Sequence, residues 1–223
     1  PYLDNLPTAP REKFAANIAA IQKLKEIEQR VANGGSPAFE DEQRILAQYT
    51  GWGGLSDAFD PNKSTWSNEY SQLKAALSES EYEAARSSTL TAFYTPATVI
   101  HPIYRALERF GVKGGKILEP SMGTGAFLAH GHFGSSDAKF YGVELDSITG
   151  RISKQLYQKA NIQVTGYENA LLPDNYFDCV IGNVPFGNFQ VNDPQYNRLH
   201  FPIHDYFFAK SIDKLRTGGI LAF

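Results

Sequence analysis

From about residue 88 onward, short runs typical of β-strands alternate with segments of helical spacing. Parallel strands need crossover connections, so this alternation predicts an α/β fold, a Rossmann-like, doubly wound and mostly parallel sheet. In such sheets ligands bind beyond the carboxyl ends of the strands. The expected strands are Lys116–Glu119, Phe140–Glu144, Ile162–Val164, Phe177–Asn183 and Gly219–Phe223, and most are separated by expected helices at Ala126–Ala129, Ile148–Lys159 and His204–Leu215.

The first ninety or so residues have a helical pattern instead. Apolar residues recur every three or four positions from Phe14 to Val31, which predicts one amphipathic helix. A second helix is expected to open at Ser36 and to bury Ile45. A third is expected to open at Ser78, where Glu81 three residues later completes a capping box.

The change of pattern predicts two domains, a helical N-terminal extension at 1–87 and an α/β core at 88–223. The chain begins without methionine and ends inside a strand-like run, so we expect a fragment of a longer polypeptide whose core stops near its fifth strand. The net charge of −3 gives no global basic field that would indicate nucleic acid. The sequence has no run of about 18 apolar residues, so no membrane span is expected.

A glycine-rich turn follows the first expected strand. Glycine lets the backbone approach a ligand closely, and the helix after the turn offers unpaired N–H groups. The third glycine of a dinucleotide-binding motif is replaced by Leu128, which argues against a nicotinamide cofactor. The turn reads Glu119, Pro120, Ser121, Met122, Gly123, Thr124, Gly125.

Acidic residues end the next two expected strands. Glu144 is placed to accept hydrogen bonds from ribose hydroxyls, with Asp146 a weaker rival for that role. Glu168 follows the third strand and is a candidate acceptor for an adenine amino group. For Glu144 the alternative is a solvated acid at a strand end, and for Glu168 it is a loop carboxylate that binds no ligand.

A helix is expected from about Ala97 to Arg109, directly after Tyr94, Thr95 and Pro96. Thr95 suits the N-cap and Pro96 the first helical position. The same helix start is a candidate site for the carboxylate of a cofactor.

The tetrapeptide Asn183, Val184, Pro185, Phe186 follows the fourth strand. The Asn183 side-chain oxygen and the Val184 carbonyl can accept both hydrogens of an exocyclic amine and localise its lone pair. Pro185 fixes the turn, and Phe186 offers a face for stacking. With an activated methyl donor, catalysis is mainly orientation and needs no strong base. The alternative is a strand-ending turn with a packed phenylalanine.

With these motifs, residues 88–223 resemble the N6-adenine DNA methyltransferases whose cofactor motifs precede the catalytic motif. The resemblance implies S-adenosylmethionine as cofactor, adenine in DNA as substrate, and flipping of the target base into a pocket. Val184 departs from the usual first proline of the (N/D)-P-P-(Y/F) motif. The resemblance implies cofactor contacts at Tyr94, Thr95, Pro96, Glu119, Pro120, Ser121, Gly123, Gly125, Glu144 and Glu168, and catalysis at Asn183, Val184, Pro185 and Phe186.

The N-terminal part resembles the methylase portion of large methylase–helicase proteins of phages, plasmids and conjugative elements. The resemblance lies in the run from Gly51 to Leu55, with Trp52, and in the segment from Glu81 to Arg86. It implies a C-terminal helicase part in the same polypeptide, a cytoplasmic location, and a link to restriction and modification.

Three alternatives stay open: methylation of RNA adenine, methylation of a protein glutamine amide, and a non-catalytic module that binds DNA or a partner protein. No metal site is expected, because His130 and His132 lack cysteine or acidic partners at ligand spacing. The lone cysteine, Cys179, fits a reducing compartment and core packing.

Overall fold

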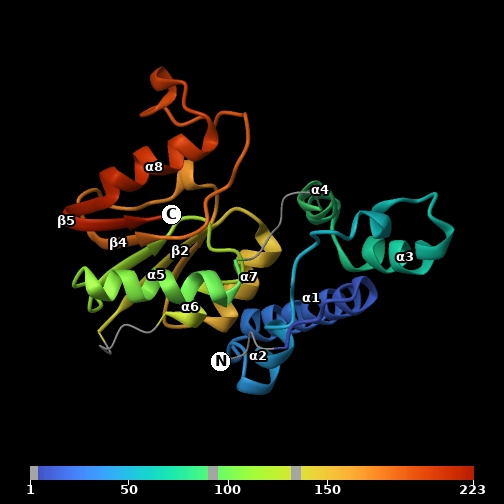
Figure 1. Ribbon diagram of the computed structural model, residues 1–223. Coiled ribbons are helices and arrows are strands. Elements are labelled where there is room, and N and C mark those ends of the chain that lie inside the picture. The colour runs from blue at the N-terminus through green and yellow to red at the C-terminus, as the bar shows by residue number, and fades with distance from the viewer. Residues whose placement is uncertain (1–4, 90–94, 132–136) are drawn as a thin grey trace. The chain divides into compact units, whose positions relative to one another are not determined.

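The computed structural model describes residues 5–89, 95–131 and 137–223 (Figure 1). By contacts between residues, the chain divides into a helical unit (1–94 and 147–158) and a sheet unit (95–146 and 159–223). Segment 147–158 therefore belongs to the helical unit, although in sequence it lies between two strands of the sheet unit. As functional domains, the expected ranges 1–87 and 88–223 stay a prediction.

The helical unit is built around buried aromatic side chains. Trp52 is 2% exposed, and its ring centroid lies 6.2 Å from that of Phe14 and 5.4 Å from that of Phe59. Trp52 is thus a packing residue of this unit. The helices are α1 (Pro10–Ala32), α2 (Glu40–Leu46), α3 (Ser67–Ala76), α4 (Glu79–Ser88) and α7 (Ser147–Leu156), with 3-10 turns η1 (Ser56–Phe59) and η2 (Ser64–Trp66).

Two expectations for the helical unit were wrong, whereas the amphipathic helix predicted from Phe14 to Val31 was confirmed as α1. The second helix begins at Glu40 rather than Ser36, because the Glu42 carboxylate accepts the Phe39 N–H (2.9 Å) and so fixes the cap there. Ile45 is 38% exposed, since the buried face of this short helix carries Glu42 and Leu46. The capping box at the start of α4 is present as predicted. Helix α3 was not predicted.

The sheet unit confirms the predicted parallel, doubly wound fold. Its strands lie in the order β3-β2-β1-β4-β5, and every pairing is parallel. The fourth strand ends two residues earlier than expected, and the fifth begins four residues earlier. The strands are β1 (Lys116–Glu119), β2 (Lys139–Glu144), β3 (Asn161–Val164), β4 (Phe177–Ile181) and β5 (Leu215–Ala222).

Helices cover both faces of this sheet (Figure 1). On one face α5 (Ala97–Arg109) and α6 (Ala126–His130) pack over Ile117, and on the other α8 (Ile203–Lys214) packs over Leu118. Consecutive strand residues point to opposite faces, so β1 contributes to both cores. The strand order reverses between β1 and β4, and the crevice at their carboxyl ends is where such folds bind ligands. Among the described residues, no helix is both long and apolar enough for a membrane span.

Candidate active site

The glycine turn leaves the carboxyl end of β1 at this crevice. Gly123 (φ 54°) and Gly125 (φ 79°) both adopt left-handed backbone, which explains why glycine stands there. The Met122 N–H donates to the Val143 carbonyl (3.0 Å), and the Gly125 N–H donates to the Met122 carbonyl (2.8 Å). These bonds fix the turn against β2 and leave its backbone at the ligand side of the sheet.

Glu144, at the end of β2, holds the same turn from the side. One carboxylate oxygen accepts the Gly123 N–H and the other accepts the Asp146 N–H, both at 2.8 Å. Burial raises the pKa of Glu144 to about 7, although these backbone hydrogen bonds act in the opposite direction. Each carboxylate oxygen has a further lone pair, so the group can still accept ribose hydroxyls.

Glu119 is a buried acid with an unmet hydrogen-bonding capacity. Its side chain is 2% exposed, and within the described part of the chain its Oε2 has no hydrogen-bond partner. Burial, with repulsion from Glu144, raises the pKa of Glu119 well above its ordinary value. Buried polar atoms are rarely left unpaired in native proteins. A ligand that brings a cation or a donor to this position would supply the missing partner.

The Ser121 hydroxyl joins the glycine turn to the tetrapeptide that was predicted to be catalytic. It donates to the backbone carbonyl of Asn183 at 2.9 Å. The residues predicted to hold the cofactor and those predicted to hold the acceptor therefore meet at the crevice between β1 and β4. The expectation that Ser121 contacts the cofactor itself stays a prediction.

The tetrapeptide has one buried and two exposed side chains. Val184 is 5% exposed and belongs to the apolar cluster under α8, whereas Phe186 is 74% exposed and Asn183 is also exposed. The alternative of a packed phenylalanine is therefore wrong for Phe186. An exposed ring beside an exposed amide is suited to stacking on a planar ligand.

Glu168 lies in the 3-10 turn η3 (Tyr167–Asn169), which follows β3. Its carboxylate accepts the Asn169 side-chain N–H (3.1 Å), and its backbone carbonyl accepts the Lys210 ammonium (3.3 Å). A Cβ at Gly166 would lie 2.1 Å from a carboxylate oxygen of Glu168, so glycine makes room for that carboxylate to fold back. The role of Glu168 toward adenine stays a prediction.

The predicted cap at Thr95 was wrong. Pro96 is the N-cap of helix α5 instead, because its carbonyl accepts the first N–H groups of the helix, those of Val99 (2.9 Å) and Ile100 (3.2 Å). Proline has no side-chain acceptor, so there is no side-chain capping bond. Tyr94 lies outside the described residues. The proposed contact of this segment with a cofactor carboxylate stays a prediction.

Sequence reasoning missed a buried polar group beneath the site. Asp193 and Lys210 are each 5% exposed, and their charged atoms lie 2.8 Å apart. The Tyr206 hydroxyl donates to the same Asp193 oxygen at 2.8 Å. The available signal was a lysine on the otherwise apolar and aromatic inner face of an expected helix.

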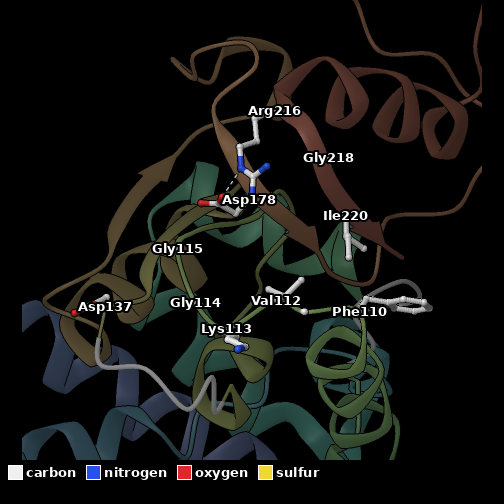
Figure 2. A pocket seen from close by; sticks show the side chains of 11 residues that line it. Phe110, Val112, Lys113, Gly114, Gly115, Asp137, Asp178, Arg216, Gly218 and Ile220 are labelled. Carbon is white, nitrogen blue, oxygen red and sulfur yellow. Dashed lines mark hydrogen bonds and ion pairs between the residues drawn. The ribbon is translucent and has the colours of Figure 1, made fainter.

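A cavity of about 360 Å³ lies elsewhere on the sheet unit (Figure 2). Its wall includes Gly115, which precedes β1, together with Asp178 near the start of β4 and Arg216 near the start of β5. Figure 2 shows the Arg216 guanidinium directed at the Asp178 carboxylate. The cavity is therefore at the amino ends of the strands, the opposite edge from the residues described above.

Comparison with known proteins agrees with this geometry. The chain is 29% identical over 216 residues to the Defense against restriction protein B of Escherichia phage P1, covering 95% of this chain and 8% of that protein. It is 31% identical over 136 residues to the Modification methylase CviBIII of Paramecium bursaria Chlorella virus NC1A, covering 59% of this chain and 36% of that enzyme. The chain thus spans only a minor part of either relative.

The fold also has a counterpart among solved structures. A Listeria monocytogenes protein assigned to the class I S-adenosylmethionine-dependent methyltransferases superposes with a TM-score of 0.50 at 16% identity, covering 93% of this chain and 72% of that one. The profile of the N-6 DNA Methylase family matches residues 79–202, more than half of the chain. Family and fold together indicate S-adenosylmethionine as the cofactor. The chain belongs to the N-6 DNA methylase family.

Proposed function

We propose that this chain carries the methyl-transfer site of a DNA adenine-N6 methyltransferase. The observation that carries the proposal is the hydrogen bond from Ser121 to Asn183. It joins the glycine turn to the tetrapeptide at the point where the strand order of the sheet reverses. Family membership supplies the reaction class. The geometry supports an arrangement in which donor and acceptor lie next to each other.

The residues present fit S-adenosylmethionine. The unpaired, buried oxygen of Glu119 suits the ammonium of the methionine part, and Glu144 suits the ribose hydroxyls. The left-handed Gly123 and Gly125 keep side chains away from the ligand side of the turn. We assign Glu168, in the turn after β3, to the adenine end of the cofactor. When bound, the cofactor supplies a methyl group activated by positively charged sulfur.

The tetrapeptide binds the methyl acceptor. The Asn183 amide oxygen and the Val184 carbonyl accept the hydrogens of the target amine and direct its lone pair at the methyl group of the cofactor. Val184 keeps its carbonyl in place through its buried side chain, which takes over part of the fixing role of the absent proline. Phe186 stacks on a base that has left the duplex, as enzymes acting on bases require.

The relatives suggest a setting for this chemistry. The name of the phage P1 protein refers to defence against restriction, and the viral enzyme is a modification methylase. We propose that this chain modifies DNA for a mobile element in the cytoplasm of a bacterial cell. We also propose that it is part of a longer polypeptide that contains a helicase. Purification of that polypeptide with DNA-dependent ATPase activity would support the helicase part.

The test of the reaction is transfer of labelled methyl groups from S-adenosylmethionine to DNA, RNA or protein offered separately. We expect label on DNA adenine, lost in Asn183→Ala and kept in the matched control Asn68→Ala, an exposed residue of α3 in the helical unit. Asn183→Ala should still bind S-adenosylhomocysteine. Label on RNA or protein alone, or equal loss of binding and transfer in Asn183→Ala, would contradict the proposal.

A further inference from the structure

The segment after the tetrapeptide is folded around one buried carboxylate. Asp193 Oδ1 accepts the Gln195 N–H (3.1 Å), and the Asp193 N–H donates to the Asn197 side chain (2.9 Å). The Asp193 backbone carbonyl accepts the N–H groups of Tyr196 and Asn197 (both 2.9 Å). Asp193 therefore organises residues 192–199, within the long connection that begins directly after Phe186.

Lys210, on α8, binds this segment to the rest of the sheet unit. Its ammonium donates to Asp193 Oδ2 and to the backbone carbonyl of Glu168, which lies in the turn assigned to the cofactor's adenine end. Its nitrogen also lies 5.1 Å from the Tyr167 ring centroid and 5.7 Å from that of Tyr206. One buried cation thus contacts two segments at the same time. They are the connection that follows Phe186, here called the acceptor-side segment, and the turn η3, here called the cofactor-side turn.

The Asp193 carboxylate and the Lys210 ammonium form a buried ion pair. Burial alone would raise the pKa of Asp193, but the hydrogen bonds from Lys210 and Tyr206 outweigh it and lower that pKa. A buried ion pair is held firmly only when its remaining hydrogen-bonding positions are filled, as they are here by Tyr206 and Gln195. Val184 belongs to the same buried cluster as Tyr167 and Tyr206.

We propose that Lys210 is a positioning residue for methyl transfer. By holding Asp193 and the Glu168 carbonyl at one point, it fixes the acceptor-side segment relative to the cofactor-side turn. Because Lys210 is itself buried, it acts through these two segments. This inference rests on the proposed function for its kinetic consequence, but the coupling of the two segments can be measured without any reaction.

Helix α8 provides a matched control one turn later. Lys214 is also buried, and it too binds one carboxylate, Asp174 (2.5 Å), and one backbone carbonyl, Leu172 (3.0 Å). These partners precede β4 and are not part of the candidate site. Lys214→Met therefore removes a second buried lysine of the same helix, one whose carboxylate partner is 52% exposed, and its loss affects stability but not the two segments.

The first experiment is hydrogen–deuterium exchange of the 223-residue chain without ligand. Lys210→Met should speed exchange of amides in both 165–170 and 187–202 relative to wild type, whereas Lys214→Met should leave these segments unchanged. Equal changes in the two variants, or a change in only one segment of Lys210→Met, would overturn the proposal. Because no substrate is added, the result does not depend on the reaction being correctly assigned.

The second experiment measures methylation of a DNA duplex at a temperature where both variants are folded. Lys210→Met should lower kcat/KM by about tenfold to a hundredfold, since small misplacements of reacting groups are that costly, and should raise KM for both DNA and S-adenosylmethionine. Lys214→Met should lose thermal stability with both KM values unchanged. An inactive wild type would count against the reaction and not against the coupling. Unchanged KM values in an active Lys210→Met would overturn the positioning role.

Discussion

At the scale of single residues, one side chain joins the two parts of the candidate site. Ser121 was predicted to contact the cofactor, and the structure shows its hydroxyl bound to the Asn183 carbonyl 62 residues away. A single hydrogen bond between two turns is a modest interaction, but it joins the proposed donor site to the proposed acceptor site. Its loss should therefore be seen in turnover before it is seen in stability.

We expect Ser121→Ala to lower kcat by about twofold to tenfold, the range for the loss of a net 0.5–1.5 kcal/mol hydrogen bond. Affinity for S-adenosylhomocysteine should change little. Ser71→Ala is the matched control, because its hydroxyl also donates to a backbone carbonyl, that of Ser67 in α3. Loss of cofactor affinity with kcat intact would contradict this expectation and support a direct contact between Ser121 and the cofactor.

At the scale of elements, helix α7 is the unexpected one. It connects β2 to β3 in sequence, yet Arg151 on α7 binds Glu28 of α1 (2.6 Å) and Glu81 of α4 (2.8 Å). Glu81 at the same time closes the capping box of α4. One arginine thus ties three helices of the helical unit together.

We expect Arg151→Met to lower the free energy of unfolding by about 1–3 kcal/mol, since it removes a charged donor from two partly buried carboxylates. Arg44→Met should cost under about 0.5 kcal/mol, because the Arg44–Glu40 pair is exposed to solvent. Urea unfolding followed by circular dichroism measures both. If the two variants were equally stable, the three-helix tie would have no energetic importance.

At the scale of the whole molecule, stability should depend on pH through the buried acids of the cofactor site. The pKa of Glu144 is raised to about 7 in the folded chain, above the ordinary value of about 4.5 expected on unfolding. The folded state therefore binds more protons than the unfolded state between these values. The stabilising contribution is fully present below about pH 4.5 and is lost as pH rises through 7.

Glu144→Gln should remove much of this dependence. Near pH 5 the variant should melt below wild type, because its amide nitrogen faces one of the two backbone N–H groups that the Glu144 oxygens accept. By pH 8 this deficit should be smaller, because the variant carries no charge next to Glu119 and Asp146. Differential scanning fluorimetry from pH 5 to 8 provides the measurement. A constant difference across the range would show that Glu144 does not titrate there.

Much of the fold could be read from the sequence because strand and helix periodicities are local. The parallel sheet, the glycine turn at the end of β1 and the tetrapeptide after β4 were all predicted, and their meeting follows from strand order alone. Local patterns were weaker at boundaries. The second helix is capped at Phe39 rather than at Ser36, where it was expected to open. Packing decides which acidic side chain accepts the N–H at the start of the helix, and here it is Glu42.

Only the tertiary structure decided which distant groups bind one another. Ser121 with Asn183, Lys210 with Asp193 and the Glu168 carbonyl, and Arg151 with two other helices all join residues that no periodicity relates. Such pairs depend on strand register and helix packing to within an ångström, which a pattern of apolar residues does not encode. The sequence by itself determined the architecture and the place of the site, and the folded chain determined what holds that site in position.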